Sequence, residues 1–271
     1  MSVLKSFAIV FSMYSRVPMP QFAWKDKDMR YVMCFFPLVG AVQGGLFFLL
    51  CFLRRLPVLC GITDEVFAAA AAALPVFVTG GIHMDGFLDT VDARHSYGDR
   101  GKKLQILKDP HAGAFAILYG GLYLAFGFAL AVQAMKTVGD AGGITDGTGG
   151  LPDWAGSALV AALIPVLSRA LSAASLMWRK SAKHEGLVYT FASKAQKKTV
   201  RVVNFATVVA AAAAMILAAP FTGACSVAVA FLVYLYYIKM ADREFGGITG
   251  DLAGYFLCIC ELLGFATAVL I

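Results

Sequence analysis

Charged residues are scarce in this sequence. They make up 15% of the 271 positions, whereas hydrophobic residues make up 59%. Soluble globular domains carry about 25% charged and about 45–50% apolar residues. The composition therefore argues against a soluble domain. The net charge of +6 does not indicate nucleic-acid binding, because we expect no soluble module that could present this charge to nucleic acid.

The sequence also lacks the cysteine and leader patterns of zinc-binding or secreted proteins. Its six cysteines form no C-x-x-C pair and fall mostly inside apolar runs, so we expect small core residues and not metal ligands. The short apolar stretch at 7–14 has no small-residue cleavage site after it. We expect an interfacial or partly inserted helix there, and no cleaved signal peptide.

Several familiar catalytic signatures are absent as well. The sequence contains no Walker A motif and no dinucleotide-binding fingerprint, so a phosphate donor is not held as in a P-loop enzyme. No Ser–His–Asp set with hydrolase spacing is present, which argues against a covalent serine nucleophile. No polar connection is long enough to fold alone, so residues 1–271 are expected to form one membrane domain.

What the sequence does contain is a series of long apolar runs. A helix of about 20 residues crosses the roughly 30 Å of hydrocarbon in a bilayer. The run at 202–238 is long enough for a helical hairpin, with its turn near Pro220 and Gly223. The expected fold is all-α, a polytopic integral membrane bundle of about seven transmembrane helices. The expected spans lie at 31–53, 66–82, 112–135, 157–178, 202–238 (two spans) and 252–271.

Lysine and arginine are distributed unevenly between the connections. With a cytoplasmic N-terminus, four segments share one side and hold 19 of the 23 Lys and Arg residues. The positive-inside rule then predicts an inner-membrane protein with its C-terminus outside and its basic side in the cytoplasm, near anionic lipid. The basic segment 179–201 is either a topology anchor or a clamp for an anionic substrate. The four segments are 1–30, 83–111, 179–201 and 239–251.

Acidic residues are concentrated in "GGIHMDGFLDTVDARHS" at 80–96. On an α-helix, Asp85, Asp89 and Asp92 fall within about 60° of one another. Three such carboxylates at a membrane boundary call for a cation, and ligands that are all oxygen favour Mg²⁺. His83 is either a further ligand or a hydrogen-bonding structural residue. The alternative is a solvated helix face, but the flanking glycines and apolar residues favour a packed helix.

Two further motifs lie on the same expected side of the membrane. "LKDPHAG" contains Lys108 and Asp109, and "GGITGD" contains Gly250 and Asp251. Glycines of this kind let backbone N–H groups approach phosphate oxygens. Carboxylates with Mg²⁺, nearby cations and a glycine turn are typical of phosphoryl transfer, in which a spare carboxylate takes the proton of the attacking hydroxyl.

These three motifs resemble those of cobalamin synthase, the adenosylcobinamide-GDP ribazoletransferase family. "YSRVPMP", "FFPLVGAVQG", "SRA" and "KHEGL" extend the resemblance over most of the chain in the family's order. Two positions depart from the family's usual glycines, at Ala93 and Ala116. Each departure adds one methyl group, and every acidic position is kept.

The resemblance implies a multi-spanning, Mg²⁺-dependent transferase, and the distribution of lysine and arginine places its active site on the cytoplasmic side. Its substrates would be adenosylcobinamide-GDP and α-ribazole or α-ribazole 5′-phosphate, and GMP would be released. Arg169, inside a span, is either a phosphate contact or a buried ion-paired residue. Spacing and resemblance together give the candidate residues: catalytic Asp85, Asp89, Asp92 and His83, metal-binding Asp85, Asp89, Asp92, Asp109 and Asp251, and substrate-binding Arg16, Lys108, Arg169 and Gly250.

Two other classes remain as alternatives. CDP-alcohol phosphatidyltransferases share the D-x-x-D core, but they continue with a second G-x-x-x-D-x-x-x-D run. Here Gly98 is followed by lysine at 102 and isoleucine at 106. An ion-coupled transporter also places acids in spans, yet the sequence shows no internal repeat. Self-association into a homo-oligomer stays open.

Overall fold

The computed structural model describes residues 2–141, 153–182 and 186–271, and these fold almost entirely as helices. Apart from one isolated bridge between Ser181 and Ile248, the described residues form no β-structure. The helices are α1 (Ser2–Tyr14), α2 (Val32–Arg54), α3 (Asp64–Thr79), α4 (Ile82–His95), α5 (Arg100–Ile106), α6 (Ala114–Asp140), α7 (Asp153–Trp178), α8 (Leu187–Lys194), α9 (Lys197–Ala218), α10 (Pro220–Met240) and α11 (Gly250–Leu270). Short 3₁₀ turns η1 (Asp26–Asp28) and η2 (Pro57–Leu59) and a π-helical turn η3 (Ala241–Phe245) complete the described elements.

The expected polytopic helical fold is confirmed. Among the described residues, six helices are long and apolar enough to cross a membrane, and a bent pair brings the number to seven if it counts as one span. The six are α2, α6, α7, α9, α10 and α11, and the bent pair is α3 with α4. The expected hairpin is also confirmed, since α9 ends at Ala218 and α10 begins at Pro220, where the missing N–H of proline is not needed.

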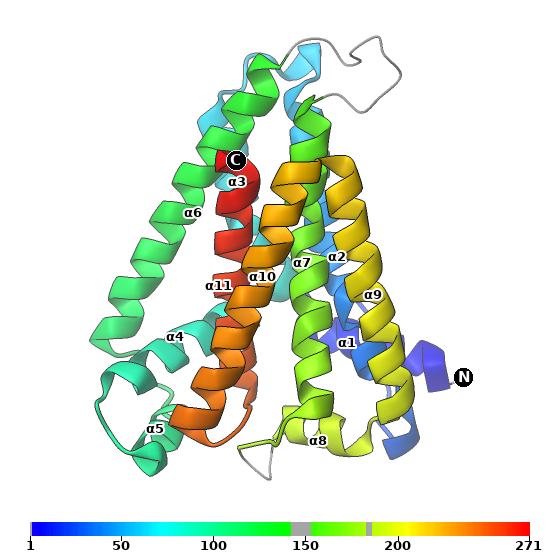
Figure 1. Cartoon of the computed structure of the whole chain (residues 1–271), viewed down its shortest axis with the longest axis vertical. Helices are drawn as coiled ribbons and strands as arrows, with labels where there is room; N and C mark the ends of the chain where they lie inside the picture. Colours follow the sequence, from blue (N-terminus) through cyan, green and yellow to red (C-terminus); the bar gives the residue numbers. More distant parts are fainter. Residues whose placement is uncertain (1, 142–152, 183–185) are drawn as a thin grey trace.

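Helix α7 is the centre of the bundle. Of its span, 78% is buried, and it packs against α2, α9, α10 and α11 (Figure 1). Glycines let α2 approach it closely, because a Cβ at Gly44 would lie 1.8 Å from the carbonyl oxygen of Ala162. Close backbone approach through small residues is a common way of packing helices in membranes.

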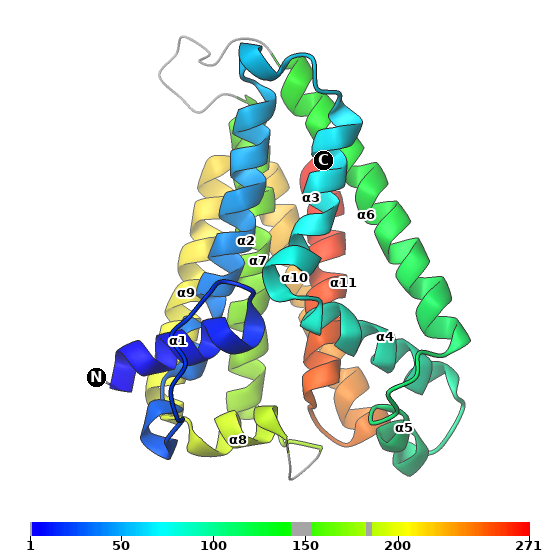
Figure 2. The same ribbon diagram turned by 180° about the vertical axis from the view of Figure 1, so that it is seen from behind.

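The span expected at 66–82 is not one straight helix. Helix α3 ends at Thr79, and α4 leaves it at an angle of 92°. Gly80 and Gly81 make this bend with φ angles of +68° and +85°, a conformation that glycine adopts without steric cost. The acidic motif therefore lies on a helix that turns across the bundle, as Figures 1 and 2 show.

The two ends of the bundle differ in character. At the lower end in Figure 2, α5, α8 and the crosswise α1 lie near the starts of α2 and α11. The turn between α2 and α3 lies at the opposite end, where Arg54 pairs with Asp64. The segments that hold most of the lysine and arginine therefore share the lower end, as the positive-inside argument predicted.

Candidate active site

A cavity of ≈ 270 Å³ lies among the lower parts of α1, α2, α4, α7, α8 and α11. Its wall carries two carboxylates, Asp85 from α4 and Asp251 from α11. His83, Thr249 and Gly250 line it as well. The "GGIHMDG" and "GGITGD" motifs, which are more than 150 residues apart in the sequence, thus meet at one cavity.

Glycines hold α4 and α11 together beside this cavity. A Cβ at Gly86 would lie 2.8 Å from the Cα of Asp251, and a Cβ at Gly254 would lie 2.7 Å from the carbonyl oxygen of His83. Neither glycine can carry a side chain unless the two backbones separate. This crossing places Asp85 and Asp251 on the same wall.

Helix N-termini also converge on the cavity. Helix α4 begins after Gly81, and α11 begins after Thr249, whose hydroxyl accepts a hydrogen bond from the N–H of Leu252 at 3.2 Å. Helix α8 begins after Gly186, which lines the cavity. The first N–H groups of a helix and the positive end of its dipole attract phosphate.

The three aspartates of α4 have different surroundings. Asp85 is exposed at the cavity, and Asp89 is half-buried one turn further along the helix. Asp92 accepts hydrogen bonds from the N–H groups of Gly113 at 2.6 Å and Ala116 at 2.9 Å, so it caps the start of α6. These bonds fix the Asp92 carboxylate and leave further lone pairs on its oxygens.

The same contact explains the glycine of "LKDPHAG". A Cβ at Gly113 would lie 2.7 Å from a carboxylate oxygen of Asp92, so a larger residue would not fit there.

The two positions where alanine replaces the family's usual glycine, Ala93 and Ala116, are buried, with exposed fractions of 0% and 1%. Their extra methyl groups are thus packed inside the protein.

In the part of the chain that the structure describes, no group of three or more His, Cys, Asp or Glu side chains is close enough to hold a metal ion by itself. Among the described residues that line the cavity, those with a carboxylate are Asp85 and Asp251. Magnesium in phosphoryl-transfer sites is usually bound by one or two carboxylates, several waters and the substrate's phosphates. Two carboxylates beside converging helix N-termini match that pattern.

The pair Lys108 and Asp109 lies apart from the cavity wall. Both residues are exposed in the connection between α5 and α6. The carboxylate of Asp109 accepts hydrogen bonds from the backbone N–H of His111 at 3.0 Å and from its ring at 2.8 Å. These bonds hold the pKa of Asp109 below its ordinary value. Asp109 thus pairs with His111 and is not gathered with Asp85 and Asp251.

Arg16 is also outside the cavity lining, just beyond the wall residue Tyr14. Its backbone N–H donates to the carbonyl of Val78 at 2.8 Å, and its side chain lies against Gly80. Arg16 therefore braces the bend between α3 and α4. The basic segment at 179–201 reaches the cavity at Ser181, while residues 183–185 of "KHEGL" lie outside the described residues.

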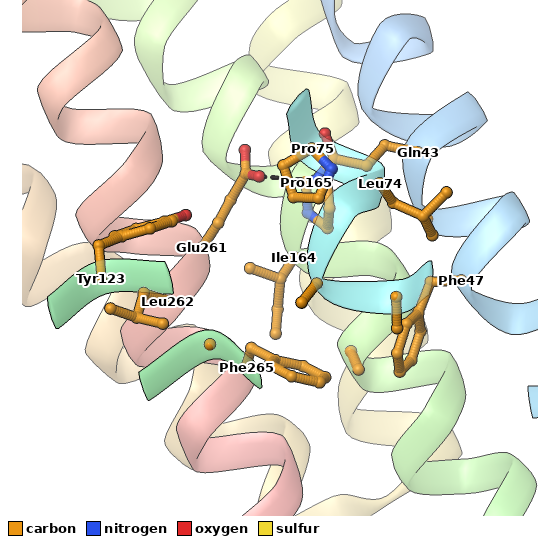
Figure 3. A pocket seen from close by; sticks show the side chains of 15 residues that line it. Gln43, Phe47, Leu74, Pro75, Tyr123, Ile164, Pro165, Glu261, Leu262 and Phe265 are labelled. Carbon is orange, nitrogen blue, oxygen red and sulfur yellow. Dashed lines mark hydrogen bonds between the residues drawn. The ribbon is translucent and has the colours of Figure 1, made fainter. Parts of the chain in front are cut away.

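Arg169 is completely buried. The sequence left open whether it contacts phosphate or forms a buried ion pair, and the structure shows an ion pair. Its guanidinium bonds to the carboxylate of Glu261 at 2.7 Å and to the amide oxygen of Gln43 at 2.8 Å. Glu261 also accepts from the amide of Gln43 at 2.7 Å, the bond drawn in Figure 3. Figure 3 shows Glu261 and Gln43 at a second, mostly apolar cavity of ≈ 90 Å³.

Sequence reasoning missed Gln43 altogether and recognised Glu261 only as an ionisable residue inside a span. The available signal was the presence of two polar residues in apolar runs, since such residues usually find partners within the bundle. Pairing them with Arg169 required the tertiary structure. The reason is that the three residues come from α2, α7 and α11.

Proteins similar to this chain match it over nearly its whole length. The family described as cobalamin-5-phosphate synthase matches residues 6–269. The chain belongs to this family. It is 40% identical over 264 residues to an adenosylcobinamide-GDP ribazoletransferase of Lachnoclostridium phytofermentans, covering 97% of this chain and 92% of that protein.

Two further relatives are less similar in sequence, but they also match this chain over most of its length. A protein of the same name from Clostridium perfringens strain 13 is 26% identical over 96% of this chain and 95% of its own length. Another, from Halalkalibacterium halodurans, is 30% identical over 93% of this chain and 90% of its own length. No solved structure matches the chain. The family resemblance inferred from the motifs is therefore confirmed.

Proposed function

We propose that this protein is an adenosylcobinamide-GDP ribazoletransferase. It would join adenosylcobinamide-GDP to α-ribazole or α-ribazole 5′-phosphate and release GMP. The observation that carries the proposal is the cavity at which the family's acidic motif and its glycine turn meet. The names of the relatives, which match along nearly their full lengths, support the same reaction.

We further propose that the site uses Mg²⁺. Asp85 and Asp251 would hold it from the wall that they share, with Asp89 on the next turn of α4 as a further carboxylate. When bound, Mg²⁺ would offset the negative charge of the donor's pyrophosphate. The backbone N–H groups at the N-termini of α4 and α11 would bind the phosphate oxygens that Mg²⁺ does not coordinate.

The reaction requires one proton transfer and one bond exchange. A free ribose hydroxyl of the acceptor attacks the phosphorus on the cobinamide side, and a carboxylate on the cavity wall takes the hydroxyl proton. A new O–P bond forms as the bond to the GMP oxygen breaks, and GMP leaves. An acceptor that already carries a 5′-phosphate has no free 5′-hydroxyl, so it has to attack through another hydroxyl of the ribose. The chain's part is to orient both reactants, as in other phosphoryl transfers.

The proposed location is the inner membrane, with the cavity open to the cytoplasm. The uneven distribution of lysine and arginine supports this orientation, because the cavity lies at the basic end of the bundle. Anionic lipid headgroups would contact the same end. The nucleotide-activated donor would then be taken up from the compartment that makes nucleotides.

The direct test is product analysis by mass spectrometry. Purified protein in lipid nanodiscs is mixed with Mg²⁺, adenosylcobinamide-GDP and α-ribazole. The expected products are a cobamide and GMP in equal amounts. Release of CMP from a CDP-alcohol would support the phosphatidyltransferase alternative instead. Substrate flux into sealed vesicles without chemical conversion would support the transporter alternative, which also uses broken helices such as the α3–α4 pair.

Replacing one carboxylate tests the metal proposal. Asp89→Asn removes a charge one helical turn from the cavity residue Asp85 without changing side-chain size. We expect transfer to fall by about 10²-fold or more, since metal and phosphate positioning commonly carry that much of the rate. The matched control is Asp140→Asn, an exposed carboxylate at the far end of α6. Normal transfer by the Asp89→Asn protein with Mg²⁺ in excess would contradict the metal proposal.

A further inference from the structure

His83 lies between the candidate active site and the buried Arg169 network. Its side chain lines the cavity that holds Asp85 and Asp251, and it is only 8% exposed. It also lines a small space beside Arg169 and Glu261. The imidazole therefore connects the reaction cavity with a polar network inside the membrane.

The two nitrogens of this imidazole have different surroundings. Nδ1 lies 3.5 Å from the Nη2 of Arg169. The Nε2 atom is buried and has no hydrogen-bond partner among the described atoms. A guanidinium has only donors, so Nδ1 has to be the acceptor of this contact. A neutral imidazole that accepts at Nδ1 carries its proton on Nε2.

Arg169 is held in place by its own partners. It donates to the carbonyl of Pro165 at 3.0 Å, as well as to Glu261 and Gln43. A buried guanidinium with three fixed partners cannot turn away without leaving charge unpaired. The donor that faces Nδ1 of His83 is therefore fixed in position.

Aromatic neighbours fix the plane of the imidazole. Tyr14 is stacked on it with ring centroids 6.1 Å apart and 23° between the planes. Phe36 meets it edge-on at 5.9 Å. The ring is thus held in one orientation, and its unsatisfied atom is the buried Nε2 of a side chain that lines the cavity. Buried donors normally have a partner, and a cavity that is filled in the working state can supply it.

We infer that His83 donates its Nε2–H to a phosphate oxygen of the bound substrate, and that Arg169 is the positioning residue that keeps it in this form. The inference rests on the proposed function. With its proton on Nε2 and its lone pair on Nδ1 facing Arg169, His83 is neither the general base nor a metal ligand. A fixed donor aimed at a phosphoryl oxygen stabilises the charge that builds up there in the transition state.

Two substitutions at position 83 separate these roles. Glutamine places an amide N–H near the position of Nε2, whereas phenylalanine keeps the ring shape and has no donor. We expect His83→Phe to lower kcat by about 10²- to 10³-fold, as loss of one such donor does in other enzymes. His83→Gln should stay within about tenfold of the unmodified protein. The Mg²⁺ concentration for half-maximal rate should be the same in both.

Equal loss in the two variants would overturn the inference, because a base or a metal ligand is not replaced by an amide. Unchanged kcat in His83→Phe would overturn it as well. A double-mutant cycle tests Arg169: Arg169→Lys should lower kcat in the native background and cause no further fall in the His83→Phe background. A purely structural role would lower kcat equally in both, and that outcome would refute the positioning role.

The tautomer can be measured without substrate. In ¹⁵N-histidine-labelled protein, NMR should show a protonated Nε2 and an unprotonated Nδ1 for the signal that remains when the other three histidines, at 95, 111 and 184, are replaced. The opposite tautomer or an imidazolium would overturn the inference even if both variants fail to fold. Absence of GMP release by the unmodified protein would refute the proposed function, whereas release with equally inactive Gln and Phe variants would refute only this inference.

Discussion

The aspartates on one face of α4 have different structural roles. Asp85 lies at the cavity, whereas Asp92 is bonded to the backbone at the start of α6. The difference arises from the direction in which α4 runs, since its first turn borders the cavity and its third turn reaches α6. Residue type and spacing alone therefore do not distinguish a ligand from a helix cap.

The capping role of Asp92 can be tested by comparing two substitutions. Asp92→Ala removes both acceptors and should lower the free energy of unfolding by about 1 kcal/mol, with a lower Tm and lower transfer activity. Asp92→Asn keeps one acceptor oxygen but turns its NH₂ group toward the second backbone N–H, so it should recover only part of the Tm. Thermal unfolding in detergent measures the difference.

The control for this comparison is Asp99→Ala. Asp99 caps the exposed helix α5 by accepting from the N–H of Lys102 at 2.8 Å. Its loss should lower Tm slightly and leave transfer unchanged, because α5 does not line the cavity. An Asp92→Ala protein with the Tm of the unmodified protein would show that Asp92 does not stabilise the start of α6.

Whole elements decide whether the carboxylates meet. The bend at Gly80 and Gly81 turns α4 across the bundle, and Gly86 and Gly254 let it touch α11. Together these four glycines bring the wall residues of α4 and α11 to one cavity. The geometry of the site therefore depends on glycines, which have no side chain and take no part in the chemistry.

Gly86→Ala tests this dependence. The new Cβ would lie 2.8 Å from the Cα of Asp251, so α4 and α11 have to separate. We expect transfer to fall by about tenfold or more, since a displacement of about 1 Å can cost as much as 10²-fold in rate. Steady-state kinetics in nanodiscs measures the loss.

The matched control is Gly121→Ala on α6, where a Cβ would meet nothing within 4 Å. That variant should insert, unfold and react like the unmodified protein. Equal activity of the two variants would mean that the α4–α11 crossing is looser than its contacts indicate.

At the scale of the molecule, the bundle separates a polar end from a membrane-facing body. The cavity of ≈ 270 Å³ lies at the polar end and is smaller than the pockets of about 300–1,000 Å³ that enclose drug-sized ligands. It has room for the reacting phosphates and a sugar, and the corrin ring would stay outside. The apolar surfaces of α6 and α9 are mostly not covered by the rest of the bundle, since 22% and 28% of these spans are buried, and in a bilayer they would face lipid.

The proposed orientation predicts a labelling pattern. Cys60 is exposed at the end of the bundle where α2 turns to α3, and Gln105 is exposed on α5 at the other end. A membrane-impermeant maleimide should label Cys60 in intact cells or spheroplasts. It should label a Gln105→Cys variant of the Cys60→Ser protein only after lysis. The positive-inside distribution is the physical reason. The reverse pattern would place the cavity outside the cytoplasm.

The sequence by itself determined the membrane class, the family and the acidic motif, because hydropathy, charge bias and residue spacing are local properties that survive without a fold. It did not determine the break at Gly80, since two glycines inside an apolar run suit a straight span and a bend equally well. Nor did it place Asp92 at α6 or Asp109 beside His111.

Only the tertiary structure decided which distant residues meet. Arg169 pairs with Glu261, 92 positions away, and Asp85 shares a wall with Asp251. Such pairs depend on which helices pack together, and packing is set by the shapes of whole helix faces. His83 shows the consequence most clearly: the motif supplies the imidazole, and the surrounding helices fix its tautomer.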